Sequence, residues 1–185
     1  ALDMRLVDPT VEDNPDSKVN MAVNNIFNKW EETKDDSLTQ VVFLDRSTPS
    51  KGFNLYDDIK SKLIALGIPE EEIKFIHDAK NDKEKVKLFE DVNEGRVRIL
   101  IGSTEKMGAG TNIQKKLCAL HHIDVPWRPS DIEQREGRIL RQGNDCKEVE
   151  IFRYATEGTF DSYSWQTIEY KQKFISQVMT NKPLG

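Results

Sequence analysis

Four consecutive apolar residues, Val41-Val42-Phe43-Leu44, decide the fold class of this chain. A short apolar run without alternation predicts a strand covered on both faces, as in a parallel sheet. Apolar residues in similar short segments predict further strands at residues 73–76, 97–101, 119–125 and 149–154. Helical spacing predicts helices starting at Ser17, at 56–66, around 86–92 and at 130–142. Because parallel strands need crossover connections, this alternation predicts an α/β domain with a mostly parallel sheet and helices on both faces.

The length of 185 residues suits one domain with short appendages. Residues 1–16 are rich in Asp, Pro and Asn and are expected to form an irregular lead-in. The domain itself is expected to span residues 17–158. Residues 159–185 are predicted to form a helical extension, because Trp165, Ile168, Ile175 and Met179 share one helical face.

Composition narrows the class of protein further. The chain is 37% hydrophobic and 32% charged, which is typical of a folded soluble domain. It has no apolar run long enough for a membrane helix and no secretory signal pattern, so a cytoplasmic location is expected. The net charge of −5 means that any nucleic-acid site must be local. Because the chain starts Ala-Leu-Asp-Met, we expect it to be a piece of a longer protein.

The segment from Pro129 to Asn144 carries the strongest functional signal. Ser130 and Glu133 have the spacing of a capping box, and Gly143 suits the residue after the last turn, so a helix is predicted. On that helix, one face carries Gln134, Arg138 and Arg141. Such a face is either a solvated basic surface with ion pairs to neighbouring glutamates or a site for an anion.

Several segments together resemble motifs of superfamily 2 helicases. Residues 134–144 are similar to the sixth motif of the Swi/Snf-like branch, although Asn144 stands where that motif ends in Gln. Residues 102–113 resemble the fifth motif, residues 122–129 resemble the strand and Trp-Asn-Pro segment between the two, and residues 41–47 resemble the fourth motif more loosely. The likeness extends to the helicase part of bacterial, phage and plasmid proteins that join such a helicase to an adenine-specific DNA methyltransferase.

The resemblance implies a three-layer RecA-like lobe, the second motor lobe of an ATP-dependent DNA helicase or translocase. The partners that it implies are DNA, an N-terminal RecA-like lobe of the same polypeptide and a fused methyltransferase domain. It implies catalytic roles for Arg138, Arg141 and Gln134. It implies cofactor contacts from Gly108, Gly110 and Asn112. It implies nucleic-acid contacts from Ser103, Thr104, Ser47 and His77.

The cofactor implied is ATP as Mg-ATP, bound mainly by the other lobe. The chain has no Gly-x-x-x-x-Gly-Lys-Ser/Thr loop, and Gly102–Gly108 is rejected as one because its glycines are too far apart and Ala109 follows instead of lysine. No acidic motif of the Asp-Glu-x-His type occurs either. We therefore expect the chain to be inactive in ATP hydrolysis by itself.

The sequence also allows other interpretations. A helicase-like scaffold or protein-interaction module is the main alternative, and the retained Gln134 and arginines argue against it. The segment 124–127, Asp-Val-Pro-Trp, resembles the catalytic motif of amino-methyltransferases, but no glycine-rich cofactor loop follows residues 41–44. Residues 108–113 lack the final glycine of a dinucleotide fingerprint. Trp127 is interpreted as a packing residue rather than a base-stacking one.

The histidines and cysteines do not predict a metal site. His121 and His122 are adjacent on a predicted strand, so they point to opposite faces and cannot bind one ion together. Packing or surface exposure is the simpler interpretation of both. The two cysteines, Cys118 and Cys146, are interpreted as buried thiols.

Overall fold

The structure is a computed structural model that describes residues 17–108, 112–126, 128–137, 144–146 and 149–155. Its centre is a five-stranded sheet with the strand order β2-β3-β1-β4-β5. All four strand pairs are parallel, which confirms the predicted parallel sheet. The strands are β1 (Thr39–Phe43), β2 (Ile73–Phe75), β3 (Ile99–Gly102), β4 (Leu117–His122) and β5 (Glu150–Arg153).

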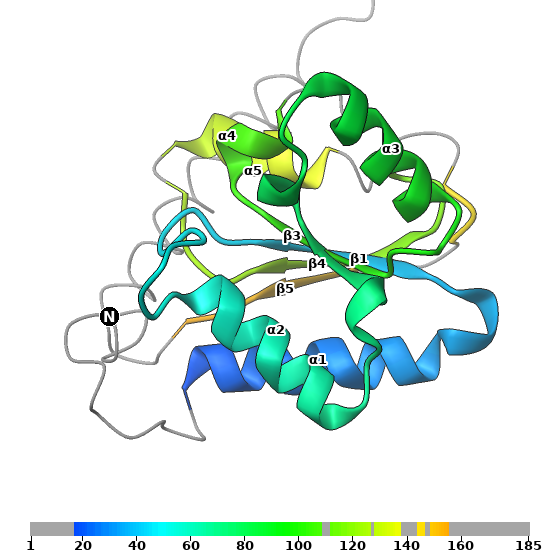
Figure 1. Cartoon of the computed structure of the whole chain (residues 1–185), viewed down its shortest axis with the longest axis horizontal. Helices are drawn as coiled ribbons and strands as arrows, with labels where there is room; N and C mark the ends of the chain where they lie inside the picture. The colour runs from blue at the N-terminus through cyan, green and yellow to red at the C-terminus, as the bar shows by residue number, and fades with distance from the viewer. Residues whose placement is uncertain (1–16, 109–111, 127, 138–143, 147–148, 156–185) are drawn as a thin grey trace, which may run out of the picture.

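Helices cover both faces of the sheet, so the domain has three layers (Figure 1). One face carries α1 (Lys18–Glu32) and α2 (Leu55–Leu66), and the other carries α3 (Asp82–Asn93), α4 (Thr104–Met107) and α5 (Pro129–Glu136). Short 3-10 turns lie at Lys34–Asp36, Glu70–Glu72 and Ile76–Asp78. Within the ranges described, no helix has the length and apolar character needed to cross a bilayer.

The predicted burial of β1 on both faces is confirmed. Val42 belongs to the hydrophobic cluster on the side of α1 and α2, whereas Val41 and Phe43 belong to the cluster on the side of α3. All three side chains have no exposed surface. Successive residues of a strand point to opposite faces, so a run with no polar residue is needed when both faces are covered.

Local signals explain the helices and their ends. Ser17 caps α1 as predicted, because its side chain accepts a hydrogen bond from the N–H of Asn20 at 3.2 Å. The helix expected around residues 86–92 is α3; Val86 is 58% exposed, and Leu88 and Val92 are the buried pair. Val92 is four positions after Leu88, so these two residues lie on the same face of the helix, and Val86 does not lie on that face.

The start of α5 differs from the prediction. The helix begins at Pro129, and Arg128 occupies the N-cap position without a side-chain hydrogen bond, so the capping box at Ser130 does not form. Proline suits the first helical position because it has no N–H to satisfy and its φ is already helical. The described part of α5 ends at Glu136, and its predicted continuation to residue 142 lies outside the described residues, as do the lead-in 1–16 and the extension from residue 156 onward.

A chain of buried polar groups ties β1, β4, β5 and α1 together. The ring of His121 lies 2.7 Å from Oε1 of Gln40 and 2.8 Å from the hydroxyl of Tyr154. The amide of Asn25 donates to the same hydroxyl at 3.2 Å. Oε1 can only accept, so Nε2 of His121 donates to it and Nδ1 accepts from Tyr154. Burial lowers the pKa of His121 to about 3, so the ring is neutral.

Candidate functional site

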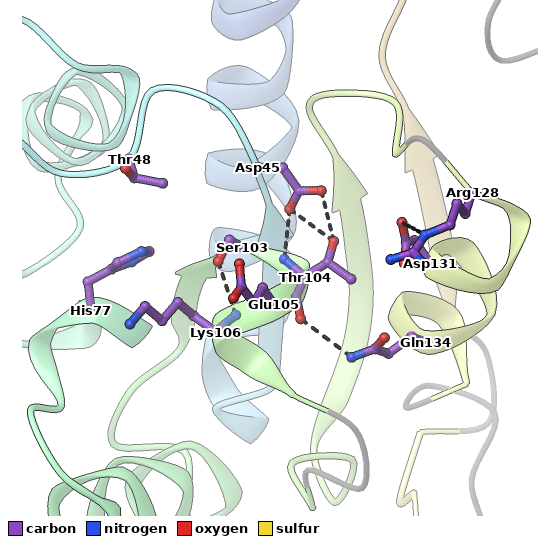
Figure 2. A pocket seen from close by; sticks show the side chains of 10 residues that line it. All are labelled: Asp45, Thr48, His77, Ser103, Thr104, Glu105, Lys106, Arg128, Asp131 and Gln134. Carbon is purple, nitrogen blue, oxygen red and sulfur yellow. Dashed lines mark hydrogen bonds and ion pairs between the residues drawn. The ribbon is translucent and has the colours of Figure 1, made fainter.

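A cavity of about 780 Å³ opens where β1, β2 and β3 end and α5 begins (Figure 2). In a parallel sheet the carboxyl ends of the strands meet at one edge, and ligands bind in the crevice there. Its lining includes both acidic and basic side chains. The lining residues are Asp45, Thr48, His77, Ser103, Thr104, Glu105, Lys106, Arg128, Asp131 and Gln134.

The cavity brings together four residues that the sequence predicted as functional: Ser103, Thr104, His77 and Gln134. Ser103 follows β3 directly and caps α4, with its Oγ accepting from the N–H of Lys106 at 3.2 Å. Gln134 approaches from α5, and its Nε2 lies 3.5 Å from the carbonyl oxygen of Thr104. Residues from the fifth and sixth motifs therefore meet across one cavity, as Figure 2 shows.

The guanidinium group of Arg135 is the centre of a buried cluster beside this cavity. Its side chain has no exposed surface. Nε donates to the hydroxyl of Thr104 at 2.8 Å, and Nη2 pairs with carboxylate oxygens of Asp45 at 2.9 Å and Asp124 at 3.1 Å. Nη1 donates to the carbonyl oxygen of Asp124 at 3.0 Å and to Nδ1 of His122 at 3.1 Å. A single side chain on α5 thus binds residues that follow β1, β3 and β4.

Thr104 lines the cavity, but its hydrogen-bond donors are bound within this cluster. Its N–H donates to Oδ1 of Asp45 at 2.7 Å, and its hydroxyl lies 2.9 and 3.0 Å from the two oxygens of the same carboxylate. The residue is only 5% exposed. Both of its donors are therefore engaged by Asp45, so this arrangement does not support the expected phosphate contact from Thr104. Ser103, one residue earlier, is 7% exposed, and its hydroxyl oxygen accepts the cap hydrogen bond of α4.

Both carboxylate oxygens of Asp124 also form hydrogen bonds within the domain. One carboxylate oxygen accepts from the N–H groups of Asp45 at 2.8 Å and Arg46 at 3.0 Å, and the other binds Arg135. Burial raises the pKa of the Asp124 carboxyl, and the positive charge of Arg135 opposes that shift. A methyltransferase motif would need this acidic side chain to face a target amine. The methyltransferase interpretation of Asp124 is therefore wrong.

His122 and Glu136 connect the cluster to β5. Nε2 of His122 lies 3.0 Å from Oε1 of Glu136, which also pairs with Nη2 of Arg153 at 3.0 Å. Since Nδ1 accepts from Arg135, Nε2 carries the hydrogen. Burial lowers the pKa of His122 to about 4, although Glu136 acts in the opposite direction. His121 and His122 therefore lie on opposite faces of β4 in packing roles, as predicted.

His77 lies on the side of the cavity that faces α2. Its ring meets that of Tyr56 edge-on, with 5.3 Å between centroids, and its Nδ1 is buried without a hydrogen-bond partner among the described residues. Burial lowers the pKa of His77, and the charge of Lys106 adds to this effect. Lys106 itself lines the same cavity. At neutral pH the positive charge on this side is thus that of Lys106.

Other predicted site residues lie elsewhere. The hydroxyl of Ser47 accepts from the N–H of Leu55 at 2.9 Å, so it fastens the loop after β1 to α2, and its neighbour Thr48 lines the cavity instead. The carbonyl of Asn112 accepts from Asn93 on α3 at 2.7 Å, beside a separate hollow. Gly108 ends α4 with a φ of 71°, a conformation that favours glycine. Arg138, Arg141, Gly110 and Trp127 lie outside the described residues.

Sequence reasoning missed the cluster around Arg135. A signal existed: Asp45 and Asp124 each follow a predicted apolar strand, and Arg135 stands three residues after Ile132, on its apolar face. Polar residues in such places require buried partners. In the part of the chain that the structure describes, no group of three or more His, Cys, Asp or Glu residues could hold a metal ion.

Comparison with known protein families shows to which family the chain belongs. Residues 26–143, more than half of the chain, match the helicase conserved C-terminal domain. The chain belongs to this family. The matched range starts within α1 and includes nearly all of residues 134–144, so it contains the sheet edge that carries the cavity. The predicted RecA-like fold is confirmed.

Two curated relatives share about a third of their aligned residues with this helicase domain. Defense against restriction protein B of Escherichia phage P1 is 34% identical over 93 residues, which are 50% of this chain and 4% of that protein. The uncharacterized ATP-dependent helicase YqhH of Bacillus subtilis (strain 168) is 33% identical over 92 residues, which are 49% of this chain and 16% of that protein. The chain thus matches only a small part of either relative.

Solved structures share the fold. The C-terminal part of the Fun30 ATPase domain has a TM-score of 0.64 at 19% identity, covering 87% of this chain and 49% of the other. The helicase MrfA bound to DNA has a TM-score of 0.58 at 20% identity, covering 80% and 20%. Dbp5 of S. cerevisiae bound to RNA has a TM-score of 0.57 at 19% identity, covering 81% and 37%. At these identities the likeness concerns the fold of the helicase domain.

Proposed function

We propose that this helicase C-terminal domain is the second motor lobe of an ATP-dependent DNA helicase or translocase. The observation that carries the proposal is the meeting of Ser103 and Gln134 across one cavity at the carboxyl edge of the sheet. One residue comes from the motif that resembles a nucleic-acid-binding segment, and the other comes from the motif that resembles a nucleotide-binding segment. A motor lobe needs both kinds of contact in close proximity.

The catalytic contribution of this lobe would come from the arginines that follow Gln134. Phosphoryl transfer spreads negative charge over the phosphate oxygens, and a cation supplied across an interface stabilises it. Arg138 and Arg141 belong to the sixth-motif segment that starts in α5, and arginine binds phosphate oxygens in a fixed two-pronged geometry. Gln134, together with the backbone near Gly108, Gly110 and Asn112, would contact the nucleotide from this side.

Nucleic acid would bind along the carboxyl edge through its phosphates. Ser103 offers a hydroxyl at the start of α4, and Lys106 offers a positive charge in the same cavity. Thr48 and His77 line the neighbouring wall, so the loops after β1 and β2 extend the same surface. Contacts of this kind position the backbone of a nucleic acid without reading its sequence. DNA rather than RNA is proposed on the resemblance to the Swi/Snf-like branch.

The nucleotide, as Mg-ATP, would be held mainly by an N-terminal lobe of the same polypeptide, since this chain has no phosphate-binding loop. This domain would then stabilise the negative charge on the phosphate oxygens and orient the nucleotide. A fused methyltransferase domain belongs to the same proposal, because it follows from the resemblance to bacterial, phage and plasmid fusion proteins. The cytoplasmic location expected from the sequence is also part of this proposal.

The decisive experiment measures ATP hydrolysis by this domain joined to its N-terminal lobe, with and without duplex DNA. Arg138→Ala is expected to reduce the DNA-stimulated rate by about 10³-fold, the lower end of what an arginine finger contributes. Arg96→Ala is the matched control, because Arg96 is a surface residue that pairs with Asp91 away from the cavity. Equal hydrolysis by wild type and Arg138→Ala would contradict the proposal and favour the scaffold interpretation.

A second experiment tests the nucleic-acid surface. Ser103→Ala should weaken binding of a DNA duplex, and the loss should be similar for unrelated sequences, because a phosphate contact carries no sequence information. Ser61→Ala, at an exposed position of α2 that does not line the cavity, should bind as wild type. Unchanged binding by Ser103→Ala would remove this residue from the proposed surface.

A further inference from the structure

We infer that Arg135 is a positioning residue that fastens the loop at Ser103 and the helix α5 into one rigid unit, so that nucleic-acid binding and the arginine segment are mechanically coupled. The functional role of this coupling rests on the proposed function. It concerns a residue that neither touches the proposed ligands nor lines the cavity. Arg135 would act through Thr104, Asp45 and Asp124.

The geometry supports a rigid unit because each connection is short and involves the buried residue Arg135 or Thr104, while the Asp45 side chain that joins them is 34% exposed. Thr104 follows Ser103 in the chain and receives the Nε–H of Arg135 at 2.8 Å. Asp45 binds both donors of Thr104 and also Nη2 of Arg135. A displacement of Ser103 by a bound phosphate must therefore move Thr104 against Arg135, or move α5 with it. Since Gln134 is the neighbouring residue on α5, that movement reaches the nucleotide-facing motif directly.

The chemical character of the cluster fits a role in geometry rather than in stability alone. A buried ion pair contributes little net stability, because desolvation of the charges offsets their attraction, and apolar residues of similar volume would serve as well. The planar guanidinium group, in contrast, holds four partner residues at defined angles, namely Thr104, Asp45, Asp124 and His122. Arg135 also stacks over the ring of Phe43, with 5.0 Å to its centroid, which restricts the side chain further. Lysine could replace the charge but not this arrangement.

The domain contains a matched control for Arg135. Arg98 is also buried, with 4% of its surface exposed. It donates to the carbonyl oxygens of Leu38 at 2.9 Å and Trp30 at 2.8 Å, and to the hydroxyl of Thr33 at 3.0 Å. Arg98 precedes β3, at the sheet edge opposite to the cavity. Replacing it with lysine removes a comparable set of buried hydrogen bonds without touching the coupled elements.

The first test compares Arg135→Lys with Arg98→Lys in the protein that joins this domain to its N-terminal lobe. The measured quantity is the ratio of ATP hydrolysis with saturating duplex DNA to hydrolysis without DNA. Coupling between two sites usually corresponds to a factor of about 5 to 150, so Arg135→Lys should lower the ratio by at least about fivefold. Arg98→Lys should keep it within about twofold of wild type. Equal ratios in the two variants would overturn the inference.

The second test needs no nucleotide and uses the 185-residue chain. Amide hydrogen exchange reports local opening of the N–H of Thr104, which donates to Asp45, and of Gly137, which donates to Glu133 in α5. In Arg135→Lys both amides should exchange faster together, whereas in Arg98→Lys neither should change. Faster exchange of the Gly137 amide with unchanged exchange of the Thr104 amide would overturn the inference that the two elements form one rigid unit. If wild type lacks DNA-stimulated hydrolysis, the proposed function fails, and this exchange test still decides the positioning role.

Discussion

Lowering the pH from 7.5 to 5 is expected to destabilise the domain through its histidines. The pKa values of His121 and His122 fall from 6.5 to about 3 and about 4, mainly because both rings are buried. Between pH 6.5 and 4 the unfolded chain therefore binds protons that the folded chain does not bind. Folding stability rises with pH wherever the unfolded state binds more protons, so acid reduces it here.

The size of the effect follows from the shifts. At pH 5, about 1.5 units below the ordinary histidine pKa, each of these two rings reduces the free energy of unfolding by about 2 kcal/mol. His77 acts in the same direction, because its pKa is also lowered. Asp124, whose pKa is raised by burial, opposes the trend. Glu136 has a lowered pKa, and its contribution is lost only below about pH 4.5, outside the chosen window.

Urea unfolding at pH 7.5, 6.5, 5.5 and 5.0, at constant ionic strength, measures this dependence. His121→Gln should remove close to one proton from the uptake on unfolding, while His77→Gln, at a partly exposed position, should remove less. Ring NMR signals give the pKa of each histidine directly. A free energy of unfolding that stays constant or increases from pH 6.5 to 5 would refute the reasoning that these rings are neutral in the fold.

Three further substitutions test packing and local conformation by thermal or urea unfolding. Tyr154→Phe should destabilise the domain by about 1–3 kcal/mol, because Nδ1 of His121 loses its buried partner; an unchanged midpoint would exclude that bond. Gly95→Ala should lower the free energy of unfolding by about 2 kcal/mol, since φ is 77° and the added Cβ would lie 2.8 Å from a backbone oxygen. Gly52→Ala is the control and should be tolerated, because there is open space around Gly52. Ser17→Ala should cost about 1 kcal/mol by removing the cap of α1, which a loss of helical signal near that end would confirm.

Much of the fold could be predicted because its signals are local. The apolar run at residues 41–44 identified the central strand, and the spacing from Val19 to Ile26 identified α1. Errors arose where two local rules competed. At α5 the proline at residue 129 prevailed over the capping box at Ser130, because its fixed φ starts the helix one residue earlier. The one-turn helix α4 was not predicted, since four residues are too few to show a period.

The candidate site was predicted in part. Ser103 and Gln134 were recognised from motifs and do line one cavity. Thr104 was recognised from the same motif, yet its donors bind Asp45, because a carboxylate from another strand lies within reach. Ser47 follows the first predicted strand and Asn112 belongs to the segment that resembles the fifth motif, but their local contacts direct them to α2 and α3. A residue directly after a parallel strand lies at the carboxyl edge of the sheet, while the direction of its side chain depends on the neighbouring residues.

By itself, the sequence determined the order of strands and helices, the parallel sheet, and the motifs that relate this chain to helicase C-terminal domains. Those properties depend on residues that are close together in the chain, where periodicity and caps are visible. Only the tertiary structure decided which polar groups meet. Asp45, Thr104, Asp124 and Arg135 are separated by up to 90 positions in the sequence, and they form one buried cluster because parallel strands end at a common edge.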